Sequence, residues 1–168
     1  MRLPVWYHEA RVKPMTDIMM TTDEILDFAI QNEQNAADLY IGLASQAKKQ
    51  TARSEYLQLS SEEKEHREIL EKVKRGRMLI GIEDQVQDFR ISDYAVDEPL
   101  GEDPDFDRIL LFAIRQEEEA FRLYTALSEL TPEGEIKDLL RNLAKEENRH
   151  KIKFESEYAA RATHTTSK

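Results

Sequence analysis

Six residues in this sequence combine side-chain types and a spacing that suit metal binding. A glutamate is followed thirty residues later by the motif Glu-x-x-His, and the same arrangement recurs 84 residues further along the chain. On a helix, a separation of three residues places the glutamate and the histidine on one face, one turn apart. The residues concerned are Glu33, Glu63, His66, Glu117, Glu147 and His150.

The four glutamates interrupt helical stripes that are otherwise apolar. Burying a carboxylate without a partner costs several kcal/mol or more, so four of them need compensation. Two divalent cations would supply four positive charges, and the imidazoles would complete the coordination. Such ligands suit iron, manganese or zinc. We therefore predict two metal ions per chain, roughly 3.5–4 Å apart and bridged by Glu63, Glu147 or both.

The duplication extends well beyond these six positions. Residues 25–71 align with residues 109–155 without a gap, and Tyr40 recurs as Tyr124. Two copies are too few for a solenoid array. They indicate one fold that is built from two related halves.

Each half contains two stretches whose apolar residues step by three and four, which is typical of helices in a bundle. The segment from Thr131 to Gly134 is a strong turn signal, and the first half has a polar stretch around Lys48. Both turns lie midway between a glutamate and its Glu-x-x-His partner, so antiparallel folding brings the partners level. The predicted helices span about residues 22–47, 52–75, 105–129 and 134–159.

The segment between the halves, residues 76–104, has no clear helical stripe and is longer than an ordinary loop. A four-helix bundle of two helical hairpins needs one long crossover of this kind. We therefore expect an all-α protein with one domain over residues 21–160. In this prediction residues 1–20 form an N-terminal extension and residues 161–168 a disordered tail.

Composition narrows the possible partners. The net charge of −10 disfavours nucleic acid and anionic membranes as partners. Without cysteine the chain forms no disulfide and no iron–sulfur site. It has neither an apolar run of roughly 20 residues for a membrane span nor the apolar core of a secretory signal. The cytoplasm is the expected location.

Two tyrosines lie two turns beyond the lone glutamates of their helices. Tyr40 and Tyr124 share a helix face with Glu33 and Glu117, respectively. A buried phenol hydroxyl needs a hydrogen-bond partner. A carboxylate ligand on a neighbouring helix would serve, and the tyrosine would then steady that ligand.

The glutamates that directly precede the two Glu-x-x-His motifs receive a different interpretation. Glu62 and Glu146 point about 100° away from the predicted ligands around the helix axis. We interpret them as acids of the solvated surface. The remaining histidines, His8 and His164, lie in terminal segments and form no comparable pattern.

One glutamate on each of two helices and Glu-x-x-His on the other two resembles the ferritin-like diiron carboxylate proteins. The runs from Glu33 to Tyr40 and from Ser61 to His66 are similar to the first two helices of rubrerythrins. The resemblance covers about residues 22–158. It implies a ferritin-like fold, a diiron centre, and redox chemistry with hydrogen peroxide or dioxygen.

The sequence departs from rubrerythrins in two respects. Rubrerythrins usually carry a rubredoxin domain with four cysteines, so electrons here are expected from a separate donor such as a rubredoxin. A seventh carboxylate ligand of rubrerythrins corresponds to Ala120. The predicted centre is therefore more symmetric, and nearer to bacterioferritin-like centres.

Three functions remain open on this evidence. The first is an oxidoreductase acting on peroxide or dioxygen, with a role against oxidative stress. The second is iron binding with ferroxidase activity and storage, which depends on assembly into a cage. The third is a structural or regulatory bundle that metal stabilises. We expect the first, acting as a homodimer without nucleic-acid or membrane partners.

Overall fold

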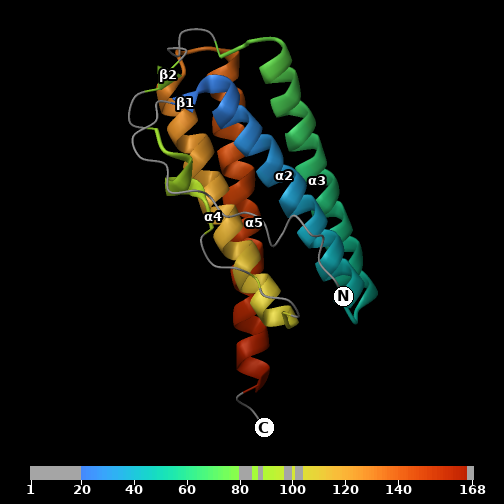
Figure 1. Cartoon of the computed structure of the whole chain (residues 1–168). Helices are drawn as coiled ribbons and strands as arrows, with labels where there is room; N and C mark the ends of the chain where they lie inside the picture. Colours follow the sequence, from blue (N-terminus) through green and yellow to red (C-terminus); the bar gives the residue numbers. More distant parts are fainter. Residues whose placement is uncertain (1–19, 80–84, 87–88, 97–99, 101–103, 166–168) are drawn as a thin grey trace.

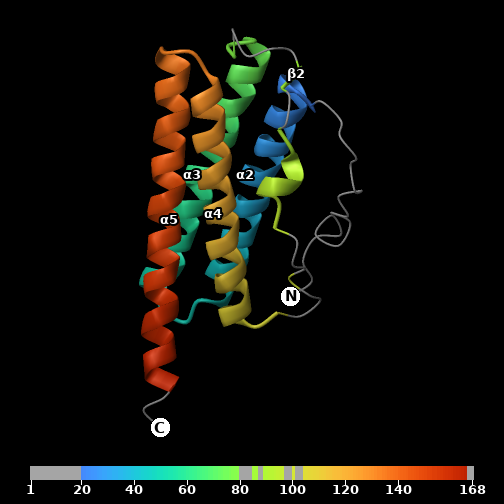
Figure 2. The same ribbon diagram turned by 90° about the vertical axis from the view of Figure 1, so that its left-hand side faces the viewer.

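The computed structural model describes residues 20–79, 85–86, 89–96, 100 and 104–165. Four long helices pair as two antiparallel hairpins that lie against each other (Figure 1, Figure 2). The predicted all-α four-helix bundle is confirmed. Among the described helices, none is both long and apolar enough to cross a membrane. The helices are α2 (Thr22–Gln46), α3 (Gln50–Arg75), α4 (Phe106–Leu130) and α5 (Glu135–Thr165).

Local sequence explains where the first helix of each hairpin begins. Thr21 caps α2 through a capping box: its side chain accepts from the Glu24 backbone N–H, and the Glu24 carboxylate accepts from the Thr21 backbone N–H. Asp105 caps α4 by accepting from the Arg108 backbone N–H at 2.8 Å. Such caps satisfy N–H groups that have no partner inside the helix. They therefore set the start of α2 and α4, and with it the level at which each glutamate stands.

Helix α5 corrects the prediction at its C-terminal end. It continues to Thr165, whereas the sequence predicted an end near residue 159 and a disordered tail from residue 161. That prediction is wrong for residues 161–165; residues 166–168 lie outside the described part. Arg161 explains the extension, because its guanidinium pairs with Asp107 at 2.5 Å and covers the Phe106 ring at 4.4 Å. These contacts attach the last turns of α5 to the start of α4.

The crossover, residues 76–104, is described only in part. It contains β2 (Gln85–Val86), which pairs antiparallel with β1 (Met20–Thr21), and the short 3-10 helix η1 (Ile91–Tyr94). Helix η1 packs on α4. Arg122 of α4 lies over the Tyr94 ring, 5.6 Å from its centroid. The other predicted part outside the bundle, residues 1–20, lies outside the described residues except for Met20.

Buried apolar side chains form two clusters, one toward each end of the bundle. The first includes Leu26, Leu70 and Leu127, and the second includes Leu43, Tyr56 and Phe154. Each cluster takes residues from all four helices, so burial of apolar surface holds both hairpins together at both ends. Between the clusters lies a layer of buried charged side chains.

Candidate metal centre

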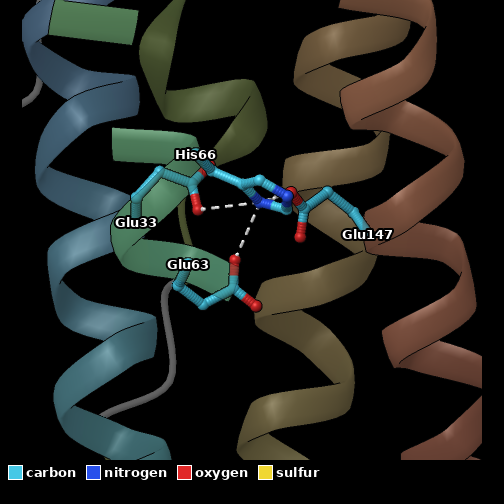
Figure 3. Close-up of side chains that lie close together, drawn as sticks. All are labelled: Glu33, Glu63, His66 and Glu147. Carbon is cyan, nitrogen blue, oxygen red and sulfur yellow. Dashed lines mark hydrogen bonds and ion pairs between the residues drawn. The ribbon is translucent and has the colours of Figure 1, made fainter. Parts of the chain in front are cut away.

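The six predicted ligands meet in the charged layer between the two apolar clusters. All six side chains belong to residues that are at most 3 % exposed. Figure 3 shows Glu33 of α2, Glu63 of α3 and Glu147 of α5 converging on His66. The structure brings together the residues that the sequence singled out, with every helix contributing at least one: Glu33, Glu63, His66, Glu117, Glu147 and His150.

The side chains form two overlapping groups, each with ligand atoms that lie within 4.8 Å of one another. Glu33 and His66 belong to the first group only, and Glu117 and His150 belong to the second only. Glu63 and Glu147 belong to both. The cluster is therefore organised around two positions with two shared carboxylates.

The shared carboxylates divide their oxygen atoms between the two imidazoles. Glu63 places Oε2 3.1 Å from His66 Nδ1 and Oε1 2.9 Å from His150 Nδ1. Glu147 places Oε1 2.9 Å from His66 Nδ1 and Oε2 3.7 Å from His150 Nδ1. Each carboxylate thus spans both positions, which is the arrangement that a bridging ligand requires.

The carboxylates of α2 and α4 are each bound by a tyrosine of the other helix. The Tyr124 hydroxyl donates a hydrogen bond to Glu33, and the Tyr40 hydroxyl donates one to Glu117. Both tyrosines are fully buried. Each phenol occupies one lone pair of its carboxylate and thereby restrains how the remaining oxygen faces the centre.

Burial and crowding shift the acid–base behaviour of the cluster. Desolvation, reinforced by the negative charge of Glu147, raises the pKa of Glu33 and of Glu117 well above the usual value. Burial also opposes ionisation of Glu147, but the adjacent imidazoles of His150 and His66 outweigh it and lower the pKa of that carboxyl. Crowding therefore favours ionisation of Glu147 over ionisation of Glu33 and Glu117.

The pKa values of the two histidines are also shifted by burial and by neighbouring charges. Burial by itself lowers the pKa of His66 and of His150, but the surrounding carboxylates outweigh this and raise it. Protons on Nδ1 then compensate the buried negative charge. A metal ion at the same place would displace those protons and take over their role.

Three buried polar atoms of the cluster form no hydrogen bond. Glu63 Oε1, Glu147 Oε1 and His150 Nδ1 have no hydrogen-bond partner among the described residues. The two oxygens each lie 2.9 Å from an imidazole Nδ1 without forming a hydrogen bond to it. Buried polar atoms are otherwise almost always satisfied. Oxygen and nitrogen atoms that face a common centre without bonding to each other suit divalent metal ions, so the residues fit two such ions.

The structure assigns a role to two glutamates that sequence reasoning missed. Glu146 accepts from His66 Nε2 at 2.6 Å, and Glu62 accepts from His150 Nε2 at 2.9 Å. Glu146 is exposed, as the interpretation as a surface acid expected, whereas Glu62 is partly buried; for both, the contact with an imidazole was missed. Each carboxylate holds the imidazole of the facing helix with Nδ1 toward the centre, as partners of metal-binding histidines commonly do. The available signal was the recurrence of a glutamate before the ligand in both halves.

The fold and the centre together define a class: a four-helix bundle of two hairpins with a buried carboxylate–histidine site between them. Sequence comparison agrees, because the model of the rubrerythrin family matches residues 24–87 and 108–166. The chain belongs to the rubrerythrin family. The two matched segments contain the two hairpins, and no curated protein matches the sequence.

Solved structures show the same architecture. A Thermotoga maritima protein described as ferritin-like and diiron-carboxylate matches with a TM-score of 0.70 and 18 % identity, over 86 % of this chain and 98 % of that chain. A hypothetical protein of Pyrococcus furiosus matches with a TM-score of 0.63 and 28 % identity, over 82 % of this chain and 87 % of that chain. The ferritin-like fold is thus shown.

Proposed function

We propose that the protein is a diiron oxidoreductase that reduces hydrogen peroxide, with dioxygen as a slower oxidant. The observation that carries this proposal is the pair of overlapping ligand groups with Glu63 and Glu147 in common. Family membership and the description of the Thermotoga maritima protein support iron as the metal.

The ligand count supports a reactive site rather than a closed structural one. Glu33, Glu63, His66 and Glu147 would hold one ion, and Glu117 and His150 would complete the other with the same shared carboxylates. Six protein ligands distributed over two ions leave coordination positions open, which distinguishes catalytic from structural metal sites.

Two ferrous ions would supply the two electrons that peroxide reduction needs, each ion becoming ferric. With these two electrons and two protons, hydrogen peroxide would be reduced to two water molecules as its O–O bond breaks. Tyr40, Tyr124, Glu62 and Glu146 orient the proposed ligands through hydrogen bonds. The apolar clusters on either side of the centre exclude bulk water. The chain contains no cysteine, so we propose that a separate donor such as a rubredoxin returns the electrons.

Stopped-flow absorbance after anaerobic iron loading tests this proposal. We expect hydrogen peroxide to oxidise the bound iron faster than free ferrous ion in the same buffer. His66→Ala and His150→Ala should each slow oxidation or lose one iron. If bound iron is oxidised no faster than free iron, the oxidoreductase proposal fails and a binding or structural role replaces it.

A second candidate, ferroxidase activity with iron storage, is favoured by Ala120. This residue of α4 occupies the position of the seventh carboxylate of rubrerythrins. It is half-buried and packs against the first apolar cluster. The centre is left with two equivalent sets of ligands, which suits the uptake of ferrous ions as substrate. Native mass separates the candidates: storage requires a cage, whereas we propose a homodimer.

A further inference from the structure

The two halves of the centre share their ligand types but differ at several neighbouring positions, and one of these differences reverses a charge next to a proposed histidine ligand. Adding 84 to each residue number of the first half reproduces every proposed ligand of the second. The same rule pairs Glu62 with Glu146. It also pairs Glu65 with Arg149, where the sign of the charge is reversed.

Arg149 is placed to affect one histidine and not the other. Its Nη2 lies 2.9 Å from Glu62 Oε2 and 3.4 Å from His150 Nε2. A cation at this distance draws electron density from the imidazole and repels a metal ion on its far side. In the sequence the equivalent position before His66 is Glu65, an exposed acid whose charge attracts a cation instead.

The two glutamates that bind the imidazoles also differ in their hydrogen-bond partners. Glu62 accepts from three side chains, namely Gln58 at 3.0 Å, Arg149 at 2.9 Å and His150 at 2.9 Å. Its equivalent Glu146 has His66, at 2.6 Å, as its hydrogen-bond partner among the described residues. Among the described residues Glu146 therefore has one imidazole as its donor, whereas Glu62 divides its charge among three donors. A more strongly polarised imidazole is a better ligand.

We infer that Arg149 makes the two metal positions unequal, so that the first divalent cation binds beside His66 and the second beside His150. This inference rests on the proposed dinuclear centre and adds an order of filling to it. Arg149 acts through Glu62 and His150 and is a positioning residue, since it touches neither proposed metal position. The expected ratio of the two dissociation constants is roughly three- to tenfold at low ionic strength, and it decreases with added salt.

Zinc tests the inference without any redox chemistry. Isothermal titration of the metal-free protein with Zn²⁺ should resolve a tighter and a weaker step. Crystals grown with one equivalent of Zn²⁺ should show anomalous scattering mainly at the position beside His66. Equal filling of both positions in the wild type would overturn the inference while leaving the proposed function intact. Absence of zinc from the cluster would overturn both.

Exchange of the two charges provides the decisive variants. Arg149→Glu and Glu65→Arg each give these two equivalent positions the same charge, so the ratio of dissociation constants should fall toward one. The double variant E65R/R149E keeps the net charge and should reverse the order, with anomalous scattering now mainly beside His150. A structural role of Arg149 alone would not reverse the order. If the double variant fills in the wild-type order, the inference is wrong.

Arg53→Glu is the matched control. Arg53 is exposed on α3 and lies ten residues before Glu63, about 15 Å along the helix. It changes the net charge by the same amount as Arg149→Glu. The inference predicts that R53E keeps the wild-type ratio and order. An equal effect of R53E and R149E would assign the result to net charge and refute the role of Arg149.

Discussion

The two sides of the bundle that meet at the centre are built differently. On the tyrosine side, α2 and α4 pack directly on each other, and the buried hydroxyls of Tyr40 and Tyr124 bind the carboxylates. On the glutamate side, α3 and α5 lie further apart and are linked by polar side chains, Glu62 and Glu146 among them. One side seals the centre, whereas the other connects it with the surface.

The side chains on the two sides differ in their exposure to solvent. Tyr40 and Tyr124 are 0 % exposed, whereas the side chains of Glu62 and Glu146 are 24 % and 48 % exposed. A neutral phenol can be buried at small cost when its hydroxyl is bound, but a carboxylate needs water or several donors. We therefore expect substitutions on the tyrosine side to change mainly the free energy of unfolding, and substitutions on the glutamate side to change mainly the affinity for metal.

The largest effect is expected where both sides meet, at the shared carboxylates. Glu147→Gln should reduce bound metal from two ions per chain to nearly none, because both ligand groups contain Glu147. Glu33→Gln should leave about one ion, because Glu33 belongs to one group. Metal analysis after loading and desalting measures both. Equal losses in the two variants would show that Glu147 is not shared.

The next effect concerns the glutamate side. Glu62→Gln and Glu146→Gln should each weaken metal binding about 10- to 100-fold, since a neutral amide polarises the imidazole less. Helix content should not change. Competition with a chelator measures the affinity, and Glu68→Gln, an exposed change on α3, serves as control. An affinity within twofold of wild type would mean that these contacts do not tune the ligands.

A smaller effect concerns the carboxylates of the tyrosine side in the metal-free protein. The pKa of Glu33 and of Glu117 is raised above the usual 4.5, because burial and Glu147 oppose ionisation. Their contribution to stability is complete below that pH and is lost as the pH rises through the folded-state pKa.

The double variant E33Q/E117Q should therefore have a higher free energy of unfolding than metal-free wild type at neutral pH, by about 2 kcal/mol. Glutamine keeps an acceptor for each phenol, so no hydroxyl is left without a partner. Denaturant unfolding at several pH values with chelator present measures the difference in free energy of unfolding between variant and wild type. This difference should decrease toward zero as the pH falls to 4.5. A gap that widens on acidification would contradict the buried-charge interpretation.

The smallest effect comes from the tyrosines themselves. Tyr40→Phe and Tyr124→Phe should each lower the free energy of unfolding by about 1 kcal/mol, since a carboxylate loses a donor. Both variants should still bind two metal ions with little change in affinity. Tyr158→Phe, at the half-buried edge of the second cluster, is the matched control. A loss of affinity as large as in the Glu62 or Glu146 variants would remove the distinction between the two sides.

Much of the fold was predictable because the helical pattern is local. The start of α2 at Thr22 and the end of α3 at Arg75 agree with the predicted residues, and the other hairpin boundaries differ by at most two residues. The end of α5 was missed, since the residues after 159 lack an apolar stripe. They remain helical because Arg161 reaches α4, a contact that no helical periodicity encodes.

The centre shows the same division between local and long-range information. By itself the sequence determined which residues are candidate ligands, because the repeat and the helical period place the four glutamates and two histidines at one level. Only the tertiary structure decided what Glu62 and Glu146 do. A helical wheel directs them away from the centre, but the separation of α3 and α5 lets each meet the imidazole of the opposite helix. Such contacts depend on the distance between helices, which the spacing along one helix does not contain.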